Sequence, residues 1–362
     1  EYRTSDLVAE QLSAWGYQVT RGLGGTGLVG QLKKGTGGKS IGIRADMDAL
    51  PIDEATGLPY ASCNVGIMHA CGHDGHTAML LAAAKHIAQK GEFSGTVNLI
   101  FQPAEEGLGG AKKMMEDGLF QKFPCTAIFA MHNMPSHPQG HLVLRDGSAM
   151  ASSDNVTITL HGKGGHGAMP HVAADPVVAG SAIVMGLQSI VARNVDPQQM
   201  AIITVGAFNA GVANNVIPQT ATLRLSVRSL DRDVRILLEK RITELVHAQA
   251  QSYGVTAEID YQRGYPVLVN HLAETDFARG VAEELVGADK VVRQGRALNG
   301  SEDFAFMLEE VPGSYLLIGN GDGSGDGHGA CMVHNPGYDF NDKNVAIGSA
   351  YWSLLVERFL PA

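Results

Sequence analysis

The sequence predicts an α/β protein in which a doubly wound, mainly parallel sheet is interrupted by an inserted ferredoxin-like α+β domain. Two observations lead to this prediction. Short apolar segments alternate with helical patterns up to about residue 150 and again after about residue 270, and such alternation is typical of parallel sheets covered by helices. Between these parts, the strand and helix patterns follow the order β-α-β-β-α-β, which is the ferredoxin-like order.

The flanking parts contain strands that are short and almost wholly apolar, as expected for strands buried on both faces. We expect strands at residues 40–44, 96–101, 126–131 and 314–318, and helices at 77–89, 274–285 and 343–360. The last helix would begin after Asn341 or Asp342, because either side chain can cap a helix N-terminus. The chain begins at Glu1 rather than Met, inside a helical pattern, so we expect further residues to precede it.

The central part has alternating rather than uniformly apolar strands, which is typical of a sheet with one solvated face. We expect strands at residues 155–161, 201–208, 220–228 and 256–261, and helices at 174–193 and 230–252. The segment is within the usual size of a small separate domain. The predicted organisation is therefore a discontinuous domain, residues 1–154 and 269–362, with an inserted domain at residues 155–268.

Composition excludes several classes of protein. A chain of 362 residues favours two domains over one. The net charge is −10 and no cluster of Lys or Arg occurs, so we expect no nucleic-acid partner. No run of about 18 apolar residues is present, so we expect no membrane association. The four cysteines are too few and too scattered for a disulfide framework, which indicates a reducing compartment and a cytoplasmic location.

Residues with metal-binding or catalytic side chains are concentrated in a few segments. These are 44–51 (RADMDALP), 68–76 (MHACGHDGH), 102–107 (QPAEEG) and 131–135 (MHNMP). The second precedes a predicted helix, and each of the others follows a predicted strand. Since open α/β sheets bind ligands beyond the carboxyl ends of their strands, we expect these segments to meet at one rim. A glycine-rich loop at 320–329 could bring His334 to the same place.

The residue types in these segments indicate a metal site. Thiolate, imidazole and carboxylate groups are the ligands of zinc and similar divalent ions. A single histidine in a loop is more often a hydrogen-bonded structural residue, but the combination of Cys, His and Glu at strand ends favours metal binding. The adjacent carboxylates of Glu105 and Glu106 repel each other. Because successive side chains of a strand point to opposite sides, we expect one to bind metal and the other to face the attacking water.

As a set, the motifs RADMDALP, HACGHDGH, FQPAEEG, MHNMP and VHNP, with GKGGHGAMPH at 162–171 and NVIP at 215–218, resemble the M20 metallopeptidase family. They are most similar to its amidohydrolase branch, which includes hippurate hydrolases, bacterial aminoacylases and plant auxin-conjugate hydrolases. The resemblance covers essentially the whole chain. It implies a metallo-amidohydrolase that hydrolyses the amide bond of N-acyl amino acids and uses two divalent metal ions per subunit: Mn, Zn, Co or Ni.

The resemblance also implies roles for individual residues. The metal ligands would be Cys71, His73, Glu106, His132 and His334. Glu105 would be the general base. Asp46 stands where other branches of the family carry the His of a His-x-Asp motif, so Asp48 would orient a ligand rather than bind metal.

Further implied residues lie in the inserted domain, which would act as a lid and dimerisation domain of a homodimer or homotetramer. His166 would reach the active site of a second subunit and donate to the reacting carbonyl, although a glycine-rich hairpin with an exposed His is the alternative. Asn215 and Arg228 would bind substrate, Arg228 through the free carboxylate. A surface arginine on a strand is nearly as good an interpretation of Arg228.

The sequence is also compatible with other functions. A dipeptidase or an aminobenzoyl-glutamate hydrolase would fit the same motifs. A cysteine hydrolase could use Cys71 with His69 or His73, but it would leave the two glutamates without a role. A non-catalytic metal-binding or peptide-binding protein is a further alternative, against which the second carboxylate argues.

Overall fold

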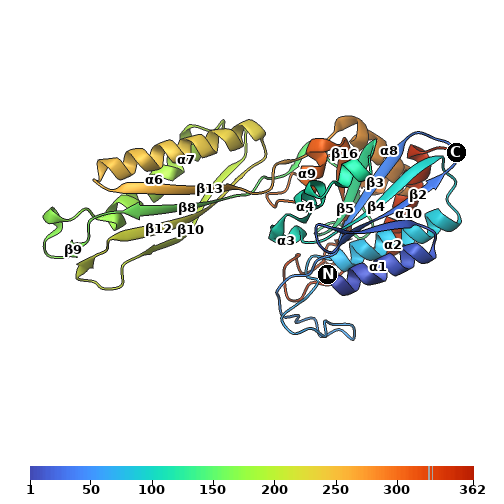
Figure 1. The fold of residues 1–362 in the computed structure, drawn as a ribbon, viewed down its shortest axis with the longest axis horizontal. Coiled ribbons are helices and arrows are strands. Elements are labelled where there is room, and N and C mark those ends of the chain that lie inside the picture. Colours follow the sequence, from blue (N-terminus) through green and yellow to red (C-terminus); the bar gives the residue numbers. More distant parts are fainter. Residues whose placement is uncertain (325–326, 328) are drawn as a thin grey trace. The chain divides into compact units, whose positions relative to one another are not determined.

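The computed structural model describes residues 1–324, 327 and 329–362, and this part of the chain forms two compact units (Figure 1). The first unit consists of Glu1–Gly147, Val269–Arg296 and Asp303–Ala362, and the second of Ser148–Leu268 and Ala297–Glu302. Residues 297–302, which the sequence prediction left in the discontinuous domain, belong to the second unit because the backbone carbonyl of Leu298 accepts a hydrogen bond from Ala151. In the predicted glycine-rich loop, residues 325, 326 and 328 lie outside the described part.

The first unit is built on a mixed, mainly parallel sheet. Its strands are β1 (Gln18–Leu23), β2 (Gly27–Lys34), β3 (Ser40–Asp46), β4 (Gly95–Gln102), β5 (Ala127–Pro135), β6 (Leu142–Val143), β15 (Val291–Val292) and β16 (Gly313–Gly321). They lie in the order β1-β2-β4-β3-β5-β16-β6-β15. The pairs β4–β3, β3–β5, β5–β16 and β6–β15 are parallel, and the pairs β1–β2, β2–β4 and β16–β6 are antiparallel. The predicted fold class is confirmed.

Helices cover both faces of this sheet. They are α1 (Tyr2–Ala14), α2 (His73–Gln89), α3 (Glu105–Leu108), α4 (Gly110–Glu116), α5 (Leu119–Lys122), α8 (Leu272–Val286), α9 (Phe304–Glu310) and α10 (Lys343–Phe359), with a 3-10 turn at Ala288–Lys290. Helices α1, α2, α8 and α10 share one apolar core with the strands. On the opposite face, the short helix α4 contacts β4 and the short helix α9 contacts β5. Ile100 of β4 and Ala130 of β5 are buried on this face, because alternate residues of a strand point to opposite faces of the sheet.

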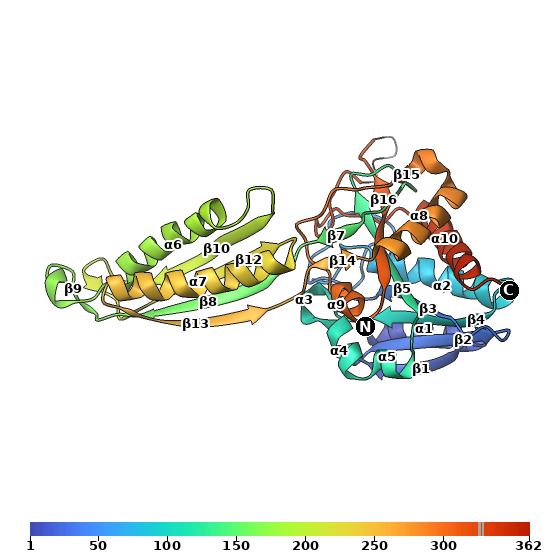
Figure 2. The same ribbon diagram turned by 90° about the horizontal axis from the view of Figure 1, so that it is seen from above.

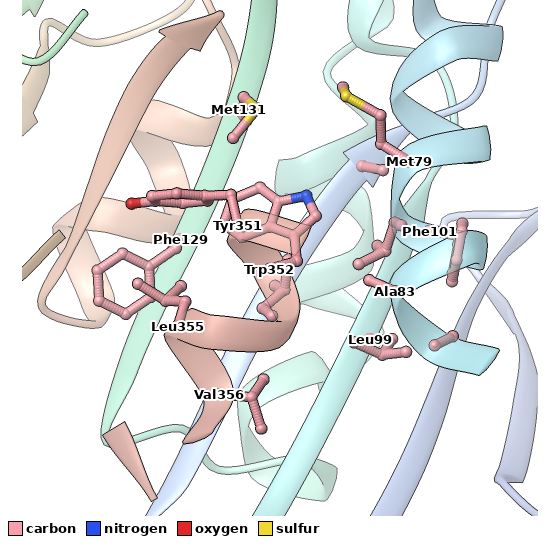
Figure 3. Close-up of a cluster of buried hydrophobic side chains, with 14 of the residues drawn as sticks. Met79, Ala83, Leu99, Phe101, Phe129, Met131, Tyr351, Trp352, Leu355 and Val356 are labelled. Carbon is pink, nitrogen blue, oxygen red and sulfur yellow. The ribbon is translucent and has the colours of Figure 1, made fainter. Parts of the chain in front are cut away.

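The main core lies between α2, α10 and the central strands (Figure 3). Trp352 and Leu355 of α10 face Phe129 of β5, and Met79 and Ala83 of α2 lie opposite (Figure 3). All five side chains are buried. This packing holds the N-terminus of α2 against the carboxyl end of β5, and both of these ends carry candidate site residues.

The boundaries of several elements differ from the sequence prediction. Strands β1 and β2 form an antiparallel hairpin that was not predicted, because β1 (QVTRGL) is half exposed and has no apolar run. Strand β5 continues past its apolar segment as far as Pro135, because its pairing with β16 continues. His132 therefore lies inside β5 rather than after it. Helix α2 begins at His73, four residues before its predicted start at Thr77.

The second unit is a ferredoxin-like α+β domain, as predicted. Its main strands are β8 (Asp154–His161), β10 (Ala201–Ala210), β12 (Thr220–Ser229) and β13 (Thr256–Arg263), and its helices are α6 (Pro176–Arg193) and α7 (Arg232–Ser252). The sheet is antiparallel, in the order β10-β12-β8-β13. Both helices pack on one face of it (Figure 2). The chain enters this unit through β7 (Gly147–Met150) and leaves it through β14 (Leu268–Asn270).

The second unit also contains a small strand pair outside its main sheet. Strands β9 (Gly165–His166) and β11 (Val216–Ile217) form an antiparallel pair, close to a 3-10 turn at Pro170–Val172.

Helix α6 is long and apolar enough to cross a membrane by length and composition, with a mean hydropathy of 1.4. A helix that packs in a protein core passes the same test, and Ile183, Leu187 and Ile190 of α6 are buried against the sheet.

Candidate metal centre

The centre of the site is the turn that leads into α2. Gly72 adopts a left-handed backbone, with φ of +82°, between Cys71 and the first helical residue, His73. Both side chains are buried. The Sγ atom of Cys71 lies 3.3 Å from Nε2 of His132, which comes from β5. The turn thus brings a thiol and two imidazoles together at the rim of the sheet.

Two potential metal sites overlap at this thiol. In the part of the chain that the structure describes, Cys71, His73 and His132 have ligand atoms within 4.8 Å of one another, and so do Cys71, Glu106 and His334. Cys71 belongs to both groups. All the predicted ligands are therefore brought together, and Cys71 is the residue that the two groups share.

The buried donor atoms fit divalent cations. Among the described residues, the buried Nε2 of His73 has no hydrogen-bond partner, and the buried Oε1 of Glu106 forms no hydrogen bond of good geometry although Nε2 of His334 lies 3.1 Å away. Buried polar atoms without partners are rare and costly, and these two lie 4.0 Å apart. Thiolate, imidazole and carboxylate ligands suit zinc, manganese, cobalt or nickel. The two groups therefore have the donors that a dinuclear centre requires.

Asp48 orients two of these residues, as its predicted role requires. Its Oδ1 atom lies 3.0 Å from Nδ1 of His73, and its Oδ2 accepts the backbone N–H of Glu106 at 2.8 Å. Since a carboxylate accepts, Nδ1 of His73 must be the donor, which leaves its Nε2 lone pair for a cation. Asp48 thereby supports ligands without occupying either potential metal site.

The local structure around Glu105 and Glu106 differs from the prediction. The pair does not extend strand β4 but begins the single-turn helix α3, after Ala104 in a left-handed conformation with φ of +54°. The two carboxylates therefore do not point to opposite sides. Instead, His73, Glu105 and Glu106 have ligand atoms within 4.8 Å of one another, so the spare carboxylate lies beside the ligands.

His334 reaches the site on a loop. Its backbone has a positive φ of 67°, and its N–H donates to the carbonyl of Ala70 at 2.7 Å. Such backbone conformations are uncommon for residues other than glycine and often occur at functional sites. The hydrogen bond fixes the loop next to Cys71, and His334 remains about half exposed.

Electrostatics link the thiol and the imidazoles. Burial would raise the pKa of the Cys71 thiol, but the adjacent His132, together with His334 and His73, lowers it to about 6. Contacts with Cys71 and Glu106 raise the pKa of His334 to about 10. Protons and cations compete for the same lone pairs, so cation binding to this cluster would release protons.

A buried polar network lies behind the ligands, and sequence reasoning assigned it no role. Arg44 forms ion pairs with Asp46 at 2.7 Å and with Asp303 at 3.1 Å, and it donates to Gln102 at 2.8 Å. His76 and Asn133 continue the network on the other side of Asp46. Arg44, Asp46 and His76 lie within the quoted motifs, and this was the available signal. Asp303 lies in no motif.

A testable consequence concerns Gly72. A Cβ atom at this position would lie 2.4 Å from both Nδ2 of Asn133 and Oη of Tyr338. We expect Gly72→Ala to lower the free energy of unfolding. The steric overlap of the new Cβ atom with Asn133 and Tyr338 should cost about 1–3 kcal/mol, and the left-handed backbone should cost about 1 kcal/mol more. Metal content measured after purification should also fall, because the turn carries two ligands.

The matched control is Gly16→Ala. Gly16 has nearly the same φ, +88°, but a Cβ atom added there would have no other atom within 4 Å. It should therefore show only the backbone cost and keep its metal content. Equal losses of stability in the two variants, measured by thermal unfolding, would contradict the steric argument.

The remaining predicted residues lie in the second unit. His166 of β9 pairs with Val216 of β11, and the carbonyl of Asn215 accepts the N–H of Gly167 at 2.8 Å, so His166 and Asn215 lie near each other in an exposed region. Arg228 lies near the far end of β12 and donates to the carbonyl of Asn299 at 3.0 Å. The structure thus brings two of the three together.

The fold is a mainly parallel α/β sheet with an inserted ferredoxin-like domain. At its rim, two overlapping ligand groups lie beside a spare carboxylate. These features are those of a metal-dependent hydrolase with a dinuclear centre. Comparison with known proteins agrees. Residues 42–358 match the Peptidase family M20/M25/M40, and the chain belongs to this family. It is a metallo-amidohydrolase of the hippurate hydrolase and deacetylase type.

Its relatives include named enzymes. The chain is 46% identical to a hippurate hydrolase of Campylobacter jejuni over 360 residues, which cover 99% of this chain and 92% of that protein. It is 39% identical to an N-acetyl-L-cysteine deacetylase of Bacillus subtilis, over 97% of this chain and 82% of the relative. A dinuclear metal-binding peptidase of the M20 family from Bacillus subtilis has a similar structure, with a TM-score of 0.85, 31% identity and coverage of 99% and 92%.

Proposed function

We propose that the protein hydrolyses the amide bond of N-acyl amino acids of the hippurate or N-acetyl type and releases a carboxylic acid and a free amino acid. The observation that carries this proposal is the overlap of two ligand groups at Cys71, with Glu105 beside His73 and Glu106. The relatives that are named for hippurate and N-acetyl-cysteine substrates support the substrate class.

The proposed roles follow from the geometry. Cys71, His73 and His132 would hold one divalent cation, and Cys71, Glu106 and His334 would hold the other. When bound, the cations supply Lewis-acid polarisation of the amide carbonyl and make water more acidic. Glu105 takes a proton from the attacking water while the oxygen of that water bonds to the carbonyl carbon. It then passes the proton to the amine nitrogen as the C–N bond breaks.

A second subunit would complete the site, in a homodimer or homotetramer. Nδ1 of His166 accepts the backbone N–H of Ala168 at 3.0 Å, so the proton of the neutral ring is on Nε2 and available for donation. We propose that this N–H of a second subunit stabilises the oxyanion, and that Asn215 and Arg228 bind substrate. The four cysteines are free, which supports the cytoplasm as the proposed location.

The test is a hydrolysis panel with metal-reconstituted protein, in which the acyl group and the amino acid are varied independently. We expect N-benzoyl and N-acetyl amino acids to be cleaved with kcat/KM well above that for dipeptides and for aminobenzoyl-glutamate. The matched control replaces the amide of the best substrate by an N-methyl amide. Preferential cleavage of dipeptides or of aminobenzoyl-glutamate would replace the proposal with the corresponding alternative.

One observation favours a second candidate. The pKa of the Cys71 thiol is lowered, and its Sγ atom lies 3.3 Å from Nε2 of His132. Cysteine hydrolases use a similar pair of a thiolate and a neighbouring imidazole. That mechanism gives no role to Glu105, Glu106 or His334, although the structure brings them to the same thiol or its neighbours. We therefore favour the metal-dependent reaction.

A further inference from the structure

His76 is a buried histidine that the proposed mechanism does not use. It lies on α2 three residues after His73 and is 1% exposed. Its ring centroid lies 4.5 Å from that of His132 and 5.5 Å from that of His73. A third histidine so close to two potential ligands is either a further ligand or a residue that positions them.

The hydrogen bonds of His76 distinguish these two possibilities. Its Nε2 atom lies 2.9 Å from the backbone nitrogen of Asn133, and since a backbone N–H can only donate, Nε2 must accept. Its Nδ1 atom then carries the proton and donates to Oδ1 of Asp46 at 2.6 Å. Neither ring nitrogen has a lone pair left for a cation. The close group of Asp46, His73 and His76 is therefore a hydrogen-bonded cluster, not a third metal site.

Asn133 passes this constraint on to the ligands. Its carbonyl accepts Nδ1–H of the preceding residue, His132, at 2.5 Å, which directs Nε2 of that ring toward Cys71. Its side-chain Nδ2 donates to the carbonyl of Cys71 at 2.7 Å and contacts Nε2 of His76 at 2.9 Å. One residue thus holds both the backbone of Cys71 and the ring of His132.

The other side of His76 is equally fixed. Asp46, which accepts its Nδ1–H, is completely buried and also accepts from Arg44 at 2.7 Å. His76 therefore joins three elements, α2, β3 and β5, and two of them carry ligands. Since the ring is neutral and both nitrogens are engaged, only one orientation of the ring satisfies every partner.

We propose that His76 is a positioning residue which, through Asn133, sets the distance between Cys71 and His132 and thereby the geometry of the cation that these residues would share. This inference rests on the proposed dinuclear function. Outer hydrogen-bond partners of metal ligands typically change metal affinity or activity about 10–100-fold when removed, and His76 acts one bond further out through the backbone of β5.

The test measures cobalt binding to the metal-free protein. Co²⁺ is titrated into the wild type, His76→Leu, His76→Gln and His86→Leu, and the visible and thiolate charge-transfer absorption is recorded. Leu removes the hydrogen bonds of both ring nitrogens, whereas the Gln amide oxygen can still accept from Asn133. His86 is exposed on the same helix and serves as the matched control.

We expect His76→Leu to bind Co²⁺ about 10–100-fold more weakly, with an altered charge-transfer band. His76→Gln should stay within a few-fold of the wild type, and His86→Leu should be unchanged. If His76→Leu does not fold, His76→Asn takes its place with the same expected loss, because the shorter amide can reach Asp46 but not Asn133.

Two results would overturn the inference alone. In the first, His76→Leu keeps the wild-type affinity and spectrum and loses only thermal stability, which would make His76 merely structural. In the second, the wild type binds a third equivalent that both His76 variants lose, which would make His76 a ligand. A wild type that binds fewer than two equivalents would contradict the proposed function together with this inference.

Discussion

Replacing Glu105 with Gln is expected to lower kcat by about 10²–10⁴-fold, the usual contribution of a positioned acid-base group. Gln has nearly the same shape but cannot take a proton from water. Glu105 is buried, and its carboxylate lies within 4.8 Å of ligand atoms of His73 and Glu106. The two ligand groups that share Cys71 do not include it, so the variant should still bind two cations, as measured by elemental analysis.

The matched comparison is Glu106→Gln, which changes the adjacent carboxylate. Glu106 belongs to a ligand group, so this variant should lose activity together with metal content. Glu116, an exposed residue of α4, provides a neutral control as Glu116→Gln. If Glu105→Gln kept more than about a tenth of the wild-type rate, it would lack the loss expected for a general base.

The second large effect is expected from chelation. A Lewis acid supplies several kcal/mol of transition-state stabilisation, and about 1.4 kcal/mol corresponds to a tenfold change in rate. We therefore expect EDTA to lower activity at least about 100-fold, and added Mn²⁺, Zn²⁺ or Co²⁺ to restore it. The same treatment should expose Cys71 to alkylation by iodoacetamide, because a thiolate that holds a cation would be protected while the cation is bound.

Cys63 is the internal control for this experiment. It is exposed in the described structure, so mass spectrometry should find it alkylated both before and after chelation. Cys71 should be alkylated only afterwards. Full activity in EDTA combined with inactivation by the alkylating agent would instead identify a cysteine hydrolase.

The sequence was most informative where a strand is buried on both faces. Strands β3, β4, β5 and β16 were located from apolar runs alone, because parallel strands in a covered sheet need apolar residues at nearly every position. Strand β1 was missed because it is a half-exposed strand of an antiparallel pair. The end of β5 was missed because pairing with β16, which no local pattern reports, extends the strand beyond its apolar segment.

The site shows the same division between local and distant information. The motifs located the residues that the structure groups around Cys71, because these motifs contain the thiol, imidazole and carboxylate side chains that bind divalent ions. The positions of Glu105 and Glu106 were argued wrongly from strand alternation, because the left-handed Ala104 redirects the chain. The ion pair of Arg44 with Asp303 could not be predicted, because it joins residues 259 positions apart.

The parallel pairing of β5 with β16 also bears on how the chain acquires its structure during synthesis. Strand β5 ends at Pro135, and its neighbour β16 begins at Gly313, after the whole of the second unit. Almost the entire polypeptide must therefore be synthesised before β5 and β16 can pair. Until then, one edge of β5 has no hydrogen-bonded neighbouring strand. Exposed edges of this kind favour aggregation. The continuous segment 148–268 can fold first. We therefore expect the sheet of the first unit, which carries the candidate metal centre, to depend most on chaperones.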